Sequence, residues 1–338
     1  MRGRPAAVAL TLVLTALVAG ACSSSPSQSA SSSTTTSTHP TTTTTAAGNA
    51  AVGSWSGALP VAPGSVLTAV SCPSPENCIM GTSKGLTYRL GYTKVSALGP
   101  AVPSPAPAGV SYLSCASISF CAAAPSQNQV ALYNGSSWGP PATIAAAQGF
   151  TAVDCTGPTF CVTIDGEGNS FAYDGNGWSG NIGAWGAANQ ISCVSPTFCV
   201  AAEGGPSVFN GSTWTQPGDA DTQGQLNAVS CPSTTFCVLV DSSGAVLTWN
   251  GTGFSAPQPI VTEPAVTGTN ASGLTGVSCP TTTFCRAVDS DGRVFGFNGT
   301  TWSAGVTIDK GHGLTAISCP STAYCVAVDR VGNAFISN

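Results

Sequence analysis

Cysteine is the residue type with the clearest chemical potential in this chain, because thiols can form disulfides, hold metal ions or carry out redox reactions. Fourteen of the 15 cysteines occur as seven pairs with the spacing C-x5-C. The pairs are Cys72 and Cys78, Cys115 and Cys121, Cys155 and Cys161, Cys193 and Cys199, Cys231 and Cys237, Cys279 and Cys285, and Cys319 and Cys325. Local pairs of this kind in an exported chain are typical of disulfides, and we predict seven of them.

Metal binding and redox chemistry fit these thiols less well. Zinc needs four ligands, usually with C-x2–4-C spacing or histidine. Here the pairs lie about 40 residues apart, and His312 is the only histidine after residue 50. Redox dithiols usually form a C-x-x-C motif, which the chain lacks. We therefore predict no metal site and no cofactor.

Acidic residues form a second candidate set, because one often follows the second cysteine of a pair by four residues. They are Asp165, Glu203, Asp241, Asp289 and Asp329. Asp241, Asp289 and Asp329 begin an Asp-x-x-Gly motif, which is typical of a turn in which the carboxylate accepts backbone hydrogen bonds. The alternative is a cluster of acids beside a pocket for a cation or a polyol. Asp289-Ser-Asp291-Gly292 resembles part of a calcium loop but supplies too few ligands.

We expect these acids to lie on one face of the fold, opposite the cysteine loops. The same face should carry the few basic residues and the long connection 263–273, since long loops on rigid scaffolds often carry recognition. The predicted binding residues are Lys84, Asp165, Glu203, Asp241, Asp289, Asp291, Arg293, His312 and Arg330.

No constellation in the sequence predicts a catalytic site. Triads of the Ser-His-Asp type need histidine, and His312 lies in a Gly-His-Gly loop. Glycoside hydrolysis needs only two carboxylates, so it remains an alternative with Asp165, Asp241 or Asp289 in the site. Whether the chain is an enzyme stays open at this level.

The cysteine pairs must be positioned by a repeat, because their first members recur at steps of 38 to 48 residues. A period of this length fits one four-stranded blade of a propeller. In the fifth repeat, residues 226–231, 237–241 and 245–249 are predicted strands, with a five-residue loop between the cysteines. Asn250-Gly251 is a hairpin signal, and Phe254 opens the outer strand. The fold class is therefore all-β, a seven-bladed propeller.

The two ends of the repeat array predict ring closure. The last repeat stops after its third strand, residues 333–338, whereas residues 53–60 match the missing outer strand through Trp55. The N-terminal strand should complete the seventh blade and so remove the open edges of the array. Aromatic residues that follow the Asn-Gly turns, such as Trp138 and Trp214, should fill the spaces between neighbouring blades.

The repeats resemble the seven-bladed propellers of exported bacterial proteins. The stretch Tyr133-Asn-Gly-Ser-Ser-Trp138 looks like the corresponding part of a kelch-type blade, and sialidase-like propellers share the architecture. Paired glycines of a kelch blade are absent from most repeats, and the sialidase box Ser-x-Asp-x-Gly-x-Thr-Trp is missing. The resemblance therefore extends to the architecture of residues 51–338 and implies no activity.

The first residues predict export and lipidation. Residues 1–21 have a basic start and an apolar run of signal-peptide length, and they end in Ala19-Gly20-Ala21 before Cys22. This end resembles the lipobox of bacterial lipoproteins, in which the cysteine after the cleavage site receives lipid. Residues 22–50 are rich in Ser and Thr, and we predict a lipidated Cys22 on a disordered tether. The protein should then be anchored outside the bacterial cytoplasmic membrane.

Composition narrows the function further. With 9 Lys and Arg against 14 Asp and Glu, the net charge of −5 excludes a nucleic-acid binder that works by electrostatics. We predict a monomeric lipoprotein whose propeller binds a protein or a glycan of the cell envelope. The alternative is a hydrolase or lyase that acts on envelope sugars.

Overall fold

The structure is a computed structural model in which residues 52–91, 94–100, 109–124, 127–183, 186, 188–217, 220, 224–262 and 273–337 are described. The predicted signal segment 1–21, Cys22, the tether 22–50 and nearly all of the connection 263–273 lie outside these ranges. No helix in the described part of the chain has the length and apolar character needed to cross a membrane.

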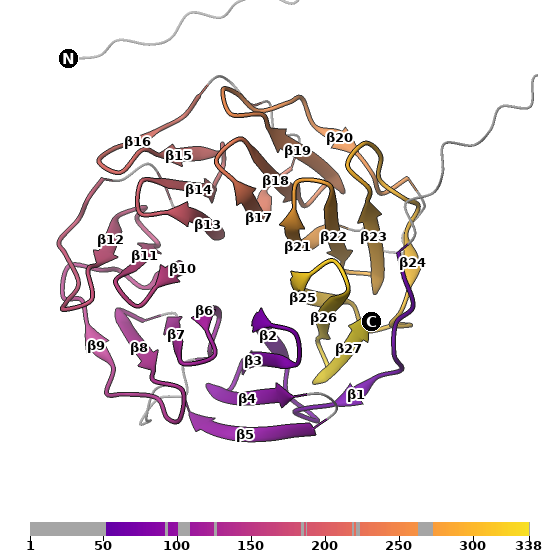
Figure 1. Ribbon diagram of the computed structural model, residues 1–338, viewed down its shortest axis with the longest axis horizontal. Coiled ribbons are helices and arrows are strands. Elements are labelled where there is room, and N and C mark those ends of the chain that lie inside the picture. Colours follow the sequence, from indigo (N-terminus) through magenta and orange to yellow (C-terminus); the bar gives the residue numbers. More distant parts are fainter. Residues whose placement is uncertain are drawn as a thin grey trace, which may run out of the picture. The chain divides into compact units, whose positions relative to one another are not determined.

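Seven antiparallel sheets stand around a central axis, and each sheet is one blade of a β-propeller (Figure 1). Blade 1 contains β2 (Leu67–Ser74), β3 (Asn77–Thr82), β4 (Leu86–Gly91) and β5 (Lys94–Pro100). Blade 2 contains β6 (Tyr112–Ser117), β7 (Phe120–Ala124), β8 (Gln129–Tyr133) and β9 (Ala142–Thr143). Blade 3 contains β10 (Phe150–Gly157), β11 (Phe160–Asp165) and β12 (Ser170–Tyr173). Blade 4 contains β13 (Gln190–Ser195), β14 (Phe198–Ala202), β15 (Ser207–Phe209) and β16 (Trp214–Thr215).

The remaining blades follow the same order from the axis outward. Blade 5 contains β17 (Leu226–Ser233), β18 (Phe236–Asp241), β19 (Ala245–Trp249) and β20 (Gln258–Pro259). Blade 6 contains β21 (Leu274–Thr281), β22 (Phe284–Asp289), β23 (Arg293–Phe297) and β24 (Val306–Thr307). Blade 7 contains β25 (Leu314–Ser321), β26 (Tyr324–Asp329) and β27 (Asn333–Ser337), with β1 (Leu59–Pro60) at its edge. The predicted fold class is confirmed.

The outer edge of blade 3 is less regular than that of the other blades. Its sheet has three strands, but the following segment still bonds to the edge. Ser179 N–H donates to the Ala172 carbonyl at 2.7 Å, and Ile182 N–H donates to the Ser170 carbonyl at 2.9 Å. The segment that contains Ser179 and Ile182 therefore takes the place of the fourth strand and is held by main-chain hydrogen bonds, although it forms no continuous strand.

Ring closure follows the sequence prediction. Leu59 and Pro60 pair with Ala334 and Asn333 of β27. Ser56 N–H donates to the Ile336 carbonyl, and its hydroxyl accepts from Ile336 N–H, at 2.8 and 3.0 Å. Trp55 packs against the cluster that contains Phe335. The predicted match between the two ends of the propeller is confirmed.

All seven cysteine pairs form disulfides, as predicted, and the Cα atoms of each pair lie 3.9 to 4.1 Å apart. Each disulfide joins the innermost strand of a blade to the second strand. The expected five-residue loop between the cysteines is wrong, because both strands continue past the disulfide. In blade 5, Ser233 pairs with Phe236, which leaves a tight turn at Thr234 and Thr235. The disulfide therefore crosslinks a β-hairpin.

A belt of seven hydrogen bonds, here called the inner belt, connects the innermost strands. The residue before the first cysteine of each blade accepts a hydrogen bond from the backbone N–H of the first cysteine of the next blade, at 2.7 to 3.0 Å. The acceptors are Ser71, Ser114, Asp154, Ser192, Ser230, Ser278 and Ser318. The belt is complete, because Ser318 of blade 7 accepts from Cys72 of blade 1.

Aromatic rings fill the spaces between blades, as the sequence predicts. Trp138 of blade 2 donates its indole N–H to the Thr87 hydroxyl of blade 1 at 2.9 Å. Trp214 of blade 4 makes the same bond to the Ser170 hydroxyl of blade 3. The Asn-Gly turn before Trp138 is closed by the Asn134 amide oxygen, which accepts from two backbone N–H groups, while Gly135 has a φ of 94°. Only glycine adopts this φ without strain.

We expect that removing one disulfide destabilises the propeller measurably. In the double variant Cys231→Ala/Cys237→Ala, the unfolded chain is no longer closed into a short loop and gains conformational entropy. By the chain-entropy relation, the unfolding free energy should fall by about 2 kcal/mol. Urea unfolding of the oxidised protein, compared with the variant Thr234→Ala in the same turn, measures the difference. Equal midpoints for the double variant and the parent protein would contradict a stabilising role for this bond.

Candidate functional site

Four of the five acids that follow the second cysteines act inside the turns after the second strands; three of them, all except Asp329, are predicted binding residues. Asp165, Asp241, Asp289 and Asp329 are fully buried, and each uses Oδ1 to accept two backbone N–H groups, from the residues two and four positions later. The interpretation as turn-capping carboxylates is confirmed. Their role in binding a ligand stays a prediction.

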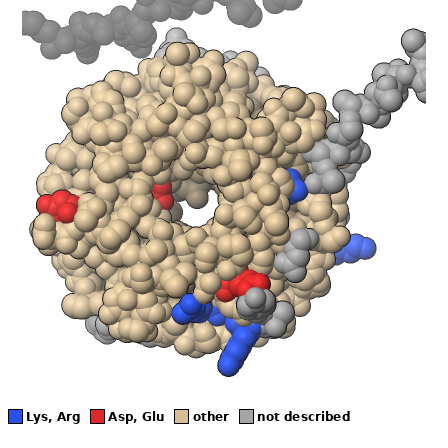
Figure 2. Space-filling model, in the orientation of Figure 1, with Lys and Arg blue, Asp and Glu red and all other residues tan. Residues whose placement is uncertain are grey.

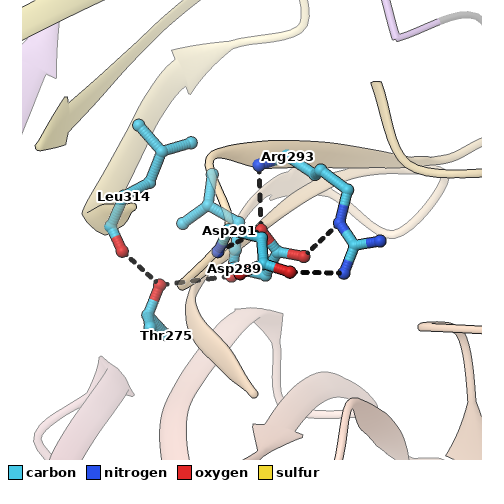
Figure 3. Close-up of polar contacts among 6 residues, drawn as sticks. Thr275, Asp289, Asp291, Arg293 and Leu314 are labelled. Atoms are coloured by element: carbon cyan, nitrogen blue, oxygen red, sulfur yellow. Dashed lines mark hydrogen bonds and ion pairs between the residues drawn. The ribbon is translucent and has the colours of Figure 1, made fainter. Parts of the chain in front are cut away.

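The second carboxylate oxygen of these acids depends on the residue four positions later. Asn169 and Asn333 donate side-chain N–H groups to Asp165 and Asp329. In blade 6 the same position is Arg293, whose Nε lies 2.6 Å from Asp289 Oδ2 (Figure 3). Its Nη2 lies 3.6 Å from Asp291, so both acids share one buried guanidinium. Of the predicted binding residues, these three are gathered into one cluster, and that cluster is a buried ion-pair network.

The other predicted binding residues are spread over blade 1, blade 4, blade 7 and the connection between blades 6 and 7. Glu203 of blade 4 is 5% exposed, and burial raises its pKa to about 7 against the opposing effect of the Ser207 hydroxyl. Lys84 is exposed and donates to the Gly64 carbonyl. Arg330 is exposed at the turn of blade 7. His312 lies in the connection between blades 6 and 7, next to Asp309. These residues do not converge on one pocket.

The central channel is lined by the innermost strands of all seven blades and encloses a volume of about 180 Å³. Figure 2 shows its opening at the centre of the ring. Its lining residues carry no charge. Much of the polar lining is already used between blades. Thr275, for example, donates to the Leu314 carbonyl of the next blade (Figure 3), and Asn227 donates to Leu274. Much of the polar lining of the channel therefore stabilises the contacts between neighbouring blades.

A larger cavity, here called the groove, lies between blades 2 and 3. Its volume is about 590 Å³, and none of its lining residues is charged. Aromatic and aliphatic side chains form most of its wall, among them Phe171, Tyr173, Trp178, Val130 and Ile144. Tyr173 and Trp178 pack together with ring centroids 5.4 Å apart. An apolar, aromatic cavity with few polar groups is the usual form of a ligand site.

The groove contains a polar group without a partner. The indole Nε1 of Trp178 is buried and has no hydrogen-bond acceptor within the described ranges. Trp138 and Trp214 find a hydroxyl on the preceding blade, at Thr87 and Ser170. The matching position of blade 2 is Val130, which cannot accept a hydrogen bond. Leaving such a donor unpaired costs about 1–3 kcal/mol.

The sequence contains the signal for this donor, but only after the blades are aligned. Thr87, Val130 and Ser170 each lie three positions before the residue that pairs with the second cysteine of their blade. Without that alignment, Val130 is one more apolar strand residue. Sequence reasoning therefore missed the groove and favoured the charged residues.

Charged side chains are sparse on the face seen in Figure 2, where acidic and basic residues lie close together over blade 1 and the others are scattered. A third cavity of about 440 Å³ in this blade is lined by Glu76, Arg89 and Lys94 together with small polar residues. Neither this cavity, the channel nor the groove is lined by two carboxylates. The paired-carboxylate geometry of a glycosidase is thus not found in these three cavities.

Fold and cavities together define the class of this protein as a disulfide-crosslinked, seven-bladed β-propeller. No protein-family model matches the sequence, and no curated protein matches it. Solved propeller structures do match the fold. "YCF48 bound to D1 peptide" is similar with a TM-score of 0.67 and 13% identity, over 84% of this chain and 96% of that one.

Two further structures show the same likeness. "YCF48 from Cyanidioschyzon merolae" has a TM-score of 0.62 and 13% identity, over 84% of this chain and 98% of the other. "Structure of U3-55K" has a TM-score of 0.70 and 12% identity, over 86% of this chain and 99% of the other. At these identities, the likeness establishes the fold alone.

Asp154 is the one acid among the acceptors of the inner belt, and it makes stability depend on pH. Its carboxylate accepts from the Ser114 hydroxyl at 2.6 Å and from Cys193 N–H at 2.7 Å. Burial outweighs these bonds and raises the pKa from 3.8 to about 6. The folded protein therefore holds this proton more tightly than the unfolded chain, and the contribution to stability is lost as the pH rises from about 4 through 6.

Asparagine cannot ionise. We therefore predict that the unfolding free energy of Asp154→Asn increases relative to that of the parent protein as the pH rises from 4 to 7. The relative gain should be on the order of 2 kcal/mol. Urea unfolding at several pH values measures it. Asp174→Asn is the control, because turn N–H groups lower the pKa of the exposed Asp174 and give the opposite sign. Parallel stability curves for Asp154→Asn and the parent protein would contradict the assignment.

Proposed function

We propose that this propeller is a binding module that holds an uncharged, apolar segment of a partner protein in the groove between blades 2 and 3. The observation that carries the proposal is the buried Trp178 N–H, which has no acceptor of its own and belongs to a residue that lines the groove. A partner peptide would supply the missing acceptor as a backbone carbonyl.

The lining of the groove defines the chemistry of the segment. Phe171, Tyr173 and Trp178 favour rings or proline, since aromatic faces pack well against flat apolar groups. The absence of charge in the lining disfavours a charged ligand, because that charge would lose water without gaining an ion pair. The Asn176 side-chain amide at the same wall can bond to the main chain of an extended peptide.

The structural comparison supports a protein partner without identifying one. One of the similar propellers, YCF48, is described as bound to D1 peptide. The same fold can therefore serve a protein that takes a peptide as its ligand, although fold alone does not decide function. A glycan is the other ligand class, since aromatic residues also pack against sugars. A glycan array against the same groove variants distinguishes the two.

The place of action in this proposal comes from the sequence. The chain would be exported through residues 1–21, lipidated at Cys22 and tethered by residues 22–50, so that the propeller stands outside the bacterial cytoplasmic membrane. An envelope protein would then be the natural partner. Detection of a lipid-modified Cys22 by mass spectrometry of the membrane fraction tests this part separately.

We expect Val130→Thr to weaken ligand binding and to stabilise the protein. The new hydroxyl stands where Thr87 stands for Trp138, so it accepts the Trp178 N–H and competes with the carbonyl of the ligand. The loss of one such bond should lower affinity about fivefold and raise the unfolding free energy by about 1 kcal/mol. Selection from a display library of uncharged peptides, followed by calorimetry with the selected peptide, measures both effects.

The matched control is Thr87→Val, which removes the acceptor of Trp138 in the neighbouring interface. It should lower stability by about 1 kcal/mol and leave peptide affinity unchanged. If Val130→Thr and Thr87→Val have the same effect on peptide affinity, or if no peptide from the library binds, the groove is not the binding site.

A further inference from the structure

A second unexplained group of side chains lies between blades 6 and 7, away from the groove. Asp309, His312 and Asp329 each offer one ligand atom, and these atoms all lie within 4.8 Å of one another. Asp309 and His312 belong to the connection that leads from β24 to β25, whereas Asp329 ends β26 of blade 7. Three potential ligands from two separate segments are thus brought together by the packing of neighbouring blades.

Asp309 is an exceptional residue at its position. Its backbone N–H donates to the Gly292 carbonyl, as the N–H groups of Ala62 and Val261 donate to Gly332 and Gly244 in their own blades. Ala62 and Val261 thus occupy the positions equivalent to Asp309, here called its sister positions, and both have apolar side chains. Asp309 is only 7% exposed, and its Oδ2 is buried without a hydrogen-bond partner among the described residues. The fold does not require an acid here, and the acid is costly without a partner.

The neighbouring groups do not neutralise this carboxylate. Asp329 is fully buried, and its two oxygens are oriented by Val331 N–H and by the backbone and side-chain N–H groups of Asn333. The Asp309 side chain contacts His312, whose Nδ1 lies 3.2 Å from Oδ1. Within the described ranges, neither acid forms an ion pair with lysine or arginine. Two close carboxylates and one imidazole are therefore left without a fixed cation.

His312 is placed by the shape of its loop. Gly311 and Gly313 have φ values of 92° and 78°, a conformation that favours glycine, and they return the chain toward Asp309. The His312 side chain is 49% exposed, so the group can be reached from solvent. The side chain thus lies at the mouth of the cluster, with the two acids behind it.

We infer that Asp309, His312 and Asp329 form a binding site for one divalent transition-metal ion, with Zn²⁺ as the best fit. Zinc is bound by imidazole nitrogen and carboxylate oxygen at about 2.0–2.2 Å, and three protein ligands with one water are a common set. Calcium prefers six to eight oxygen ligands and has little use for imidazole. The bonds from Asn333 to Asp329 supply the outer-shell orientation that metal ligands usually have.

The test uses the full chain with its disulfides formed, stripped of metal by a chelator. Titration with zinc chloride, followed by calorimetry and by the thermal midpoint, should show one saturable site and a rise in the midpoint. Calcium chloride should give neither effect. Cobalt chloride should give visible absorption from a site with nitrogen and oxygen ligands, which reports on coordination independently of stability.

Two variants decide the assignment. Asp309→Val reproduces the residue of the sister position at Val261, so it should keep or raise the metal-free midpoint while it abolishes zinc binding. His312→Ala changes a half-exposed loop residue and should lower zinc affinity by about tenfold or more. His39→Ala and the exposed Glu167→Gln serve as controls and should bind zinc as the parent protein does.

Two outcomes would overturn the inference. One is the absence of saturable zinc binding to the parent protein. The other is binding by Asp309→Val or His312→Ala with the affinity of the parent, because the ion would then be held elsewhere on the chain. If Asp309→Val fails to fold, His312→Ala and the cobalt spectrum still decide the result.

Discussion

The propeller depends on one repeated interaction, in which the residue before each first cysteine accepts the backbone N–H of the first cysteine in the next blade. Seven such bonds form the closed inner belt, and none can be removed without leaving a buried donor unpaired. Each disulfide lies beside the belt and fixes the hairpin that presents both the donor and the acceptor. The short motif Ser-Cys-x5-Cys therefore specifies a link within a blade and a link between blades.

This arrangement explains how a chain with few charges remains a defined structure. Backbone ladders, disulfides and the inner belt carry the fold, so ion pairs are needed only locally, as between Arg293 and Asp289. The repeat also gives each position up to six counterparts in the other blades. Positions that depart from their counterparts at a cost in stability are then the natural candidates for function. Asp154 and Asp309 are departures of this kind.

Much of the architecture could be predicted from sequence because it is encoded within each repeat. Cysteine spacing, the turn at Asn250-Gly251 and the match between Trp55 and Trp302 led to the blades, the disulfides and the closure. Charged residues misdirected the search for a site. Asp165, Asp241 and Asp289 attract attention as isolated acids in a neutral chain, yet they cap turns, because a strand end needs acceptors for its free N–H groups.

The sequence by itself determined the number of blades and the pairing of the cysteines, since each depends on residues that are near in the chain or repeat with a fixed period. Only the tertiary structure decided which residues meet between blades. The unpaired Trp178 N–H depends on Val130, 48 residues earlier, and the cluster around Asp309 depends on Asp329 in the next blade. Such contacts arise from the packing of one sheet against another, and no local spacing rule encodes them.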